Sequence, residues 1–335
     1  MPKPWTADQI LDLARSFQPA CVLAAAADLD LFDAFGTAHL TADAIARHLQ
    51  CNKRGITILL DALVALQMLN KHSTRYSVPA SITKILTHDG SDNVLAMAQH
   101  QANCSRRWDQ LAKVIKTGKP AQCVPSIRGE RGDTASFIGA MHAINARVAA
   151  KVVQDIQPLP FNRLLDVGGA SGTWTIAFLH ANPSGSATIF DLPPVISLAK
   201  RRLKEAGLRQ RVNLVKGNFY TDPLPKGCDL AWVSAIVHQN SRHQNRLLFR
   251  KVYRALDNGG RIVIRDILME ESRTAPISGA LFAVNMLVGT KGGGTFTFEE
   301  LRDDLRAAGF VGAKVVRQDE GMNVVIVAKK FYQLG

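Results

Sequence analysis

The sequence has few of the features that mark exported, membrane-spanning or disulfide-stapled chains. Its five cysteines among 335 residues are widely spaced and form no C-x-x-C pair, which argues against a disulfide framework or a cysteine-rich zinc site. No charge-free apolar run approaches the ~20 residues needed to cross a bilayer. The first residues lack the apolar core of a secretion signal, and no repeat or low-complexity stretch is present. We therefore expect a cytoplasmic globular protein.

The composition itself is ordinary, with 47% apolar and 21% charged residues. At roughly 100–200 residues per domain, the length predicts two domains. Lys and Arg exceed Asp and Glu by 41 − 28 = 13. Most of this excess lies in residues 161–335, which hold 24 basic and 15 acidic residues. The basic balance makes a nucleic-acid partner one hypothesis to weigh.

The first part of the chain has the element order of a winged-helix domain. Residues 8–35 are largely apolar and helical in pattern, and Thr41 precedes a short amphipathic helix as its cap. A longer helix over 54–69 and a small β-wing over 72–78 follow. We predict a winged-helix-like domain over residues 1–100 and connecting helices over 101–158.

From Arg163 the pattern changes to short apolar strands that alternate with helices, which is typical of a parallel sheet with crossover helices. Pro158 and Pro160 break the preceding helix. The fold class predicted for residues 159–335 is therefore α/β, with a Rossmann-like sheet. The expected strands are 163–167, 187–190, 212–216, 229–235, 261–267, 313–317 and 323–329. The expected helices are 173–181, 194–206, 241–256 and 298–308.

A glycine-rich loop follows the first expected strand, in Leu164-Leu-Asp-Val-Gly-Gly-Ala-Ser-Gly-Thr-Trp. Thr173 is expected to cap the next helix. A dinucleotide loop of the G-x-G-x-x-G type would place glycine where Ala170 and Thr173 stand, so a pyrophosphate is not favoured. Asp191 ends the second strand and can accept the two ribose hydroxyls of a nucleoside. A nucleoside cofactor without pyrophosphate suggests S-adenosylmethionine; a plain strand-to-helix turn is the alternative.

Four motifs carry a resemblance to a known family: Asp166-Val-Gly-Gly-Ala-Ser-Gly, Phe190-Asp-Leu-Pro-Pro-Val-Ile, Gly217-Asn-Phe and Ile236-Val-His-Gln-Asn. In this order they resemble the plant- and bacterial-type small-molecule O-methyltransferases, which include caffeate, hydroxyindole and polyketide enzymes. The resemblance covers nearly the whole chain. It implies a seven-stranded, S-adenosylmethionine-binding domain preceded by an all-helical, winged-helix dimerisation domain, and hence a homodimer.

The resemblance also assigns roles to individual positions. It implies that His238 is the catalytic base and that Asp266 flanks it. It implies cofactor contacts from Asp166, Gly168, Gly169, Ala170, Asp191, Leu192, Gly217, Asn218, Phe219 and Ser234. It implies acceptor contacts from Met141, Phe282, Met286 and Thr290. The chain departs from the family pattern at Ala170, at Asn218, at Gln239-Asn240 (where the family has Asp-Trp) and at Thr295, where a second flanking acid is expected.

Methyl transfer to a hydroxyl requires alignment of the acceptor oxygen and removal of its proton. His238 ends a predicted strand, at the edge where open α/β sheets bind ligands. It could instead be a surface or helix-capping residue. Asp266 could orient the imidazole, or simply pair with Arg265. No His, Cys or acidic group has metal-ligand spacing, so we predict no metal.

Two other classes of function remain open. A protein of the same fold could methylate carbon, or use S-adenosylmethionine without transferring its methyl group. A winged-helix regulator that binds DNA is a more distant hypothesis. The helix beginning at Arg54 is apolar on nearly every face, so it favours burial, against another subunit, over contact with DNA.

Overall fold

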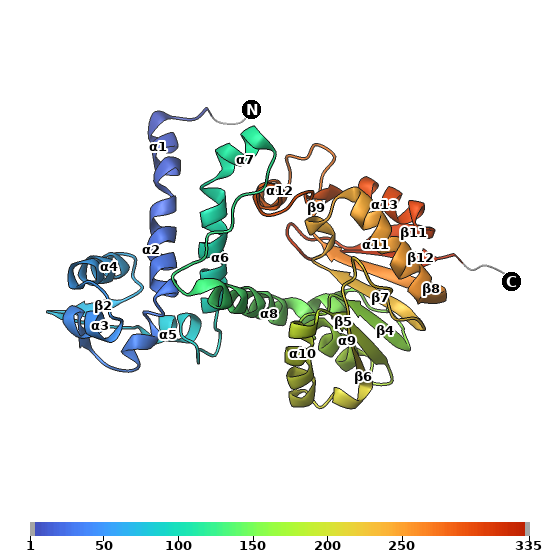
Figure 1. Ribbon diagram of the computed structural model, residues 1–335, viewed down its shortest axis with the longest axis horizontal. Helices are drawn as coiled ribbons and strands as arrows, with labels where there is room; N and C mark the ends of the chain where they lie inside the picture. Colours follow the sequence, from blue (N-terminus) through green and yellow to red (C-terminus); the bar gives the residue numbers. More distant parts are fainter. Residues whose placement is uncertain (1–3, 332–335) are drawn as a thin grey trace. The chain divides into compact units, whose positions relative to one another are not determined.

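The computed structural model describes residues 4–331, which divide into two compact units (Figure 1). Residues 4–109 and 123–144 form the first unit, and residues 110–122 and 145–331 form the second. Helix α8 (Gly129–Asp155) contributes residues to both. The predicted outer domain limits at 1 and 335 lie outside the described residues.

The first unit is helical with one small sheet. Strands β2 (Asn70–His72) and β3 (Arg75–Ser77) form an antiparallel pair at the place where a wing over 72–78 is predicted, and β1 (Leu40–Thr41) pairs with β3. Thr41 caps the following helix as predicted, because its Oγ1 accepts a hydrogen bond from the Ala44 amide at 3.2 Å. The helices of this unit are α1 (Ala7–Arg15), α2 (Phe17–Asp28), η1 (Asp33–Phe35), α3 (Ala42–His48), α4 (Lys53–Ala65), α5 (Ala80–Leu86) and α6 (Leu95–Trp108).

Helix α4 buries its apolar side mainly within its own unit. Ile56, Leu60 and Leu63 are at most 2% exposed and belong to a core that also holds Phe32 and Ile45. The expectation that this helix needs another subunit for its burial is therefore wrong for most of its apolar face. The large apolar side chain that remains exposed on α4 is Ile58.

Helices α1 and α2 are the apolar elements that the first unit leaves exposed. Ile10, Leu13 and Phe17 are each about half exposed or more. By length and composition alone, Ala7–Asp28 could cross a membrane. One such stretch is weak evidence, since other kinds of helix meet the same criterion, and Ser16 separates it into two helices. An exposed apolar surface of this kind needs a partner.

The second unit contains a seven-stranded sheet in the order β11-β12-β8-β7-β4-β5-β6. The five strands from β8 to β6 are parallel, and β12 and β11 complete the sheet in antiparallel fashion. The predicted strands are confirmed, although four begin earlier than expected: β5 and β7 by one residue, β11 by three and β8 by five. The bounds are β4 (Arg163–Val167), β5 (Ser186–Asp191), β6 (Val212–Lys216), β7 (Cys228–Ser234), β8 (Leu256–Asp266), β11 (Phe310–Arg317) and β12 (Val324–Lys330).

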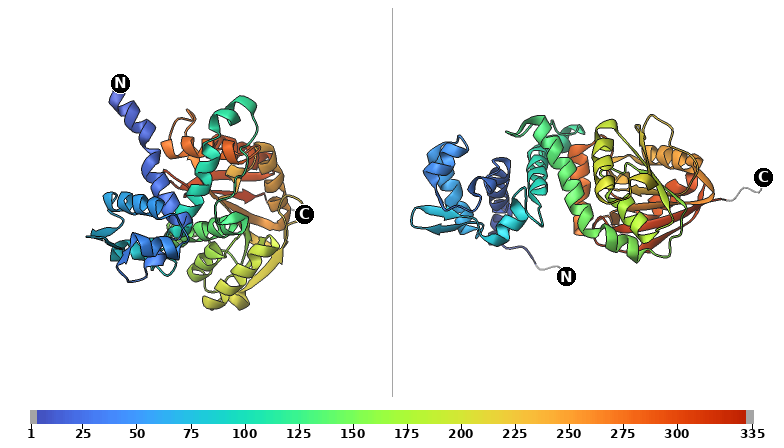
Figure 2. Two further views of the ribbon diagram at one scale, coloured as in Figure 1. Left: turned by 60° about the vertical axis from the view of Figure 1, so that its left-hand side comes forward. Right: turned by 90° about the horizontal axis from the view of Figure 1, so that it is seen from below.

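Helices cover both faces of this sheet (Figure 2). On one face α8, α9 (Thr173–Ala181) and α10 (Pro193–Glu205) pack around Trp232 and Phe178. On the other, α11 (Arg242–Ala255) and α13 (Phe298–Ala307) pack around Phe249. Helix α7 (Leu111–Thr117) lies within the predicted connecting helices. The pattern does not predict α12 (Ile277–Gly289) or the short paired strands β9 (Leu268–Met269) and β10 (Phe296–Thr297).

Candidate active site

The glycine loop lies where β4 ends, next to the end of β5. The Gly168 amide donates to the Phe190 carbonyl at 2.8 Å, so the loop is fixed to the neighbouring strand. Gly168 has a φ of +66°, and a Cβ there would lie 2.8 Å from Ile236 Cδ1. A Cβ at Gly169 would lie 2.8 Å from the Asp166 carboxyl carbon. Only glycine fits these two positions, and the loop presents bare backbone.

Thr173 does not cap helix α9, which corrects one prediction. The capping position is Gly172, whose φ of +76° suits glycine, and Thr173 is the first helical residue. Its hydroxyl lies 3.0 Å from Ser171 Oγ and accepts a hydrogen bond from Arg202 on α10 at 3.1 Å. Thr173 therefore helps to hold the outer side of the loop instead of the helix end.

Asp191 lies at the end of β5 and is bonded to the glycine loop. Its Oδ2 accepts from the Ala170 amide at 2.7 Å, and its Oδ1 accepts from the Leu192 amide at 2.6 Å. Burial raises the pKa of this carboxyl, although the two amides oppose the shift. Ala170 has a φ of +46°, unusual for a residue with a Cβ. The bond to Asp191 is one contact that holds this conformation.

Asp166 lies directly under the loop and is 1% exposed. It accepts a hydrogen bond from Thr175 Oγ1 at 2.6 Å. Burial, opposed by the hydrogen bonds from Thr175 and supported by the nearby Asp191 carboxylate, raises its pKa to about 7. Thr175, on α9, was not predicted as part of the site.

The segment after β6 brings three further predicted residues to the same edge. The Gly217 amide donates to the Asp191 carbonyl at 3.0 Å, and a Cβ at Gly217 would collide with the Phe190 ring. Asn218 begins a turn that Asp222 caps, through a 2.8 Å bond from the Asn218 amide. A Cβ at Gly168 would lie 3.7 Å from the Phe219 ring. The two loops are therefore neighbours, as the motif order implied.

Ser234 ends β7 and accepts a hydrogen bond from Arg265 Nη1 at 3.2 Å. Arg265 is 1% exposed, stacks on the Trp174 ring at 4.6 Å and donates to Asn323 through Nε and Nη2. Burial lowers its pKa to about 10. The guanidinium is directed to Ser234 and Asn323, so the alternative in which Asp266 pairs with Arg265 is not favoured.

His238 and Asp266 are in direct contact. His238 lies in a short 3-10 turn, η3 (Val237–Gln239), after β7, and Asp266 ends β8. The imidazole Nδ1 lies 2.9 Å from Asp266 Oδ1 and 3.1 Å from Oδ2. Asp266 is 2% exposed and also accepts from the Ile267 amide at 2.8 Å. With Nδ1 directed at the carboxylate, Nε2 is the nitrogen left to meet a reacting proton.

The predicted acceptor residues of the second unit differ in their contacts and in their exposure. Phe282, on α12, contacts the His238 ring edge-on with centroids 4.9 Å apart. Met286 is 8% exposed, and the Thr290 hydroxyl is bonded to the Met286 carbonyl at 2.7 Å and the Gly293 amide at 2.8 Å. Met141 lies on α8 in the first unit, and its role stays a prediction.

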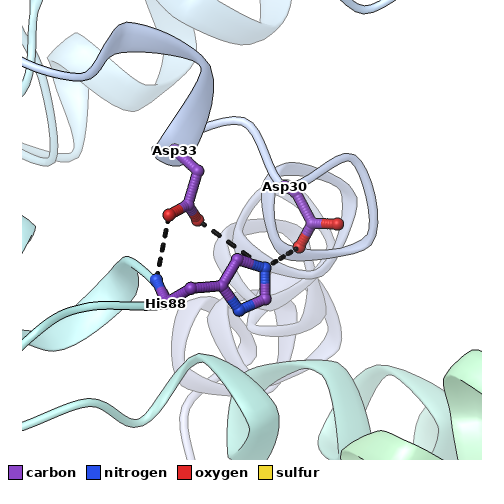
Figure 3. Close-up of side chains that lie close together, drawn as sticks. All are labelled: Asp30, Asp33 and His88. Atoms are coloured by element: carbon purple, nitrogen blue, oxygen red, sulfur yellow. Dashed lines mark hydrogen bonds and ion pairs between the residues drawn. The ribbon is translucent and has the colours of Figure 1, made fainter.

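The first unit contains a group of side chains that sequence spacing did not reveal as potential metal ligands (Figure 3). His88 Nε2 lies 3.3 Å from Asp30 Oδ1 and 4.0 Å from Asp33 Oδ2, and the His88 amide donates to Asp33 Oδ1 at 2.9 Å. Gln99 also donates to Asp30. These contacts hold the three side chains together, although Asp33 Oδ2 is buried without a hydrogen-bond partner. The absence of a metal requirement stays a prediction.

A surface hollow of about 630 Å³ lies away from these residues. Its lining includes Pro160, which precedes β4, Asp229, the second residue of β7, and Gly260, which lies in β8 just before Arg261, the residue that pairs with Leu230 of β7. It therefore lies at the amino ends of the parallel strands, whereas open α/β sheets bind their ligands at the carboxyl ends.

Comparison with known proteins identifies the family. Residues 109–311 match the O-methyltransferase domain and residues 11–81 the O-methyltransferase dimerisation domain. The chain is 30% identical to a 3-hydroxy-5-methyl-1-naphthoate 3-O-methyltransferase of Streptomyces sahachiroi, over 96% of this chain and 94% of that protein. It is 26% identical to an L-tyrosine C(3)-methyltransferase of Streptomyces lavendulae, over 90% and 85%. A solved structure described as PigF with SAH superposes with a TM-score of 0.86 at 26% identity, covering 97% of this chain and all of that one.

The fold and these matches define a methyltransferase of the class with a Rossmann-like, S-adenosylmethionine-binding sheet. The chain belongs to the O-methyltransferase family, and it is an enzyme.

The raised pKa of Asp166 predicts how stability depends on pH. The unfolded chain loses this proton near pH 4, whereas the native state keeps it until about pH 7. The contribution of Asp166 to the free energy of unfolding is therefore complete below pH 4 and declines as the pH rises to 7. Asp166→Asn removes this decline. The loss in the free energy of unfolding between pH 5 and pH 7 should therefore be about 2 kcal/mol smaller in the variant than in the wild type. Urea unfolding at both pH values measures the difference, and identical pH slopes would contradict the prediction.

Proposed function

We propose that the enzyme transfers a methyl group from S-adenosylmethionine to a hydroxyl of a small aromatic molecule, with His238 as general base. The observation that carries this proposal is the bonded His238–Asp266 pair at the carboxyl edge of the sheet. The names of relatives support the acceptor class: they include a hydroxynaphthoate and an acetylserotonin O-methyltransferase.

The residues present fit the cofactor. Gly168 and Gly169 leave a cradle that a Cβ would fill, and Gly217 allows the neighbouring loop to pass close by. The Asp191 carboxylate retains acceptor capacity beyond its two amide bonds, enough for ribose hydroxyls. We infer that Gly168, Gly169 and Ala170, with Asp166 beneath them, hold the amino-acid portion. Asp191 and Leu192 hold the ribose, and Gly217, Asn218 and Phe219 hold the purine. Ser234 supplies a further cofactor contact at the end of β7.

The chemistry follows from charge. Bound S-adenosylmethionine supplies a methyl group made electrophilic by a positive sulfur. The acceptor hydroxyl must lose its proton as it attacks, and His238 Nε2 is placed to take it. Asp266 fixes the ring through Nδ1 and stabilises the imidazolium that forms. Phe282, with Met286 and Thr290, is proposed to line the acceptor side, and Met141 is proposed, from the resemblance alone, to contact the acceptor.

A second candidate function is methyl transfer to carbon. One relative is named as a C-methyltransferase, and Gln239, Asn240 and Thr295 depart from the expected O-methyltransferase pattern. Use of the cofactor without methyl transfer belongs to the same alternative. NMR analysis of the product distinguishes a methoxy group from a C-methyl group and from an unmethylated product.

We also propose the organisation of the chain: a winged-helix-like dimerisation domain over 1–100, connecting helices over 101–158 and the catalytic domain over 159–335. The enzyme is proposed to act in the cytoplasm as a homodimer, without a metal, nucleic acid or membrane. Helix α4 supports the absence of a nucleic-acid role, because after Lys53 and Arg54 it exposes Ile58 and Asp61 and no further basic or amide side chain.

Asp191 should dominate cofactor affinity. Calorimetric titration with S-adenosylhomocysteine should give micromolar binding to the wild type. Asp191→Ala should weaken it roughly 30-fold or more, because hydrogen bonds to a charged group are lost. Glu205→Gln, which alters an exposed carboxylate on α10, is the control and should bind like the wild type. Equal affinity in the two variants would remove Asp191 from the site.

His238 should matter for turnover and not for cofactor affinity. His238→Gln should lower methyl transfer by ~10²–10⁴-fold while S-adenosylhomocysteine still binds. The assay follows S-adenosylhomocysteine release with a panel of hydroxynaphthoates, hydroxyindoles and polycyclic phenols. His243→Gln, five residues away on the exposed side of α11, is the control. An undiminished rate in His238→Gln would rule out the general base.

The exposed apolar side chains of α1 and α2 should form the dimer contact. Leu13→Glu with Phe17→Glu should convert the dimer to a monomer in sedimentation velocity at micromolar concentration, because charge replaces the apolar contact. Val311→Glu, at an exposed position of the second unit, should leave the dimer intact. A wild-type monomer at this concentration would refute the proposal.

A further inference from the structure

A chain of hydrogen bonds joins the loop after β6 to the turn that carries His238. The Tyr220 hydroxyl donates to Asn240 Oδ1 at 2.7 Å, and Asn240 Nδ2 donates to Asn245 Oδ1 at 3.0 Å. Asn245 Nδ2 in turn donates to the carbonyl of Val237, the residue before His238, at 3.0 Å. Asn240 and Asn245 are both fully buried.

The other end of this chain lies in the loop proposed to receive the purine. The Tyr220 amide donates to Asn218 Oδ1 at 3.0 Å, and its ring contacts the Phe219 ring with centroids 4.5 Å apart. Lys251, on α11, donates to the Phe219 and Tyr220 carbonyls at 2.9 and 2.8 Å. The loop is thus fixed by its backbone, and Tyr220 is its side-chain link to the turn.

The energetics favour a close coupling. A buried amide that loses a partner costs about 1–3 kcal/mol, because water cannot replace that partner. Tyr220 is about half exposed, so its own hydroxyl could be satisfied by solvent. The bond therefore matters mainly to Asn240. Displacement of the loop must move Asn240 or leave its Oδ1 without the Tyr220 hydroxyl, and Asn245 connects Asn240 to the turn that carries His238.

We propose that Tyr220, acting through Asn240, is a positioning residue that couples the cofactor loop to the orientation of His238. This inference rests on the proposed function, in which Asn218 and Phe219 hold the purine and His238 accepts the proton. The family pattern expects Trp at position 240, where this chain has Asn, so the link between Tyr220 and Asn240 is not part of that pattern. Binding of the cofactor then changes the orientation of the His238 imidazole before the acceptor binds.

The test compares Tyr220→Phe, which removes only the hydroxyl, with Tyr253→Phe on α11, whose ring packs against Phe310. The probe is the Cε1–H resonance of His238 in protein labelled with ¹³C-histidine, assigned with His238→Gln. Without ligand, Tyr220→Phe should move this resonance and Tyr253→Phe should not. An unchanged His238 resonance in Tyr220→Phe would overturn the proposal.

Saturating S-adenosylhomocysteine provides the second measurement. It should shift the His238 resonance in the wild type, and the shift should fall to less than half in Tyr220→Phe. Affinity for S-adenosylhomocysteine should weaken by about tenfold at most, so both proteins can be saturated. A full shift in Tyr220→Phe would also overturn the coupling. If the wild type does not bind this ligand, the proposed function fails, whereas the ligand-free comparison still judges the hydrogen-bonded link.

Discussion

The parallel register of β7 and β8 is the constraint on which the candidate active site depends. Ser234 pairs with Arg265, so the residues that follow them leave the sheet side by side. Asp266 ends one strand, and His238 lies in the turn after the other. The 2.9 Å contact between their side chains is therefore a consequence of strand pairing and not of a flexible loop. The same principle aligns the ends of β4 and β5, where Val167 pairs with Phe190.

Three carboxylates at this edge differ because their surroundings differ. Asp166 has one hydroxyl partner, lies in an apolar interior and is therefore easily protonated. Asp191 has two amide partners that partly offset burial. Asp266 has an imidazole and an amide beside it. Asp266 thus lies against a side-chain ring, whereas Asp166 accepts a hydrogen bond from a hydroxyl and Asp191 accepts from backbone amides.

Much of this could be predicted from sequence, for a physical reason. Strands such as Arg163–Val167 and Val212–Lys216 are short, apolar and bounded by turn residues, so local pattern defines them. The prediction that Thr173 caps α9 is wrong because Gly172, in the left-handed conformation, is the cap and Thr173 is the first residue of the helix. Contacts between distant residues, such as Asp30 with His88, depend on packing that no local pattern contains.

The departures from the family pattern also show that local sequence does not contain the contacts of a residue in the folded chain. In the sequence alone, Asn240 is only a replacement of the Trp that the family pattern has two residues after His238. In the folded chain it is a fully buried amide whose hydrogen bonds run to Tyr220 and Asn245. An amide can be buried at this position only if its partners are present, because an unpaired one would cost as much as a substantial fraction of a domain's net stability. Asn240, Asn245 and the Tyr220 hydroxyl thus depend on one another, and the position is a connected part of the site.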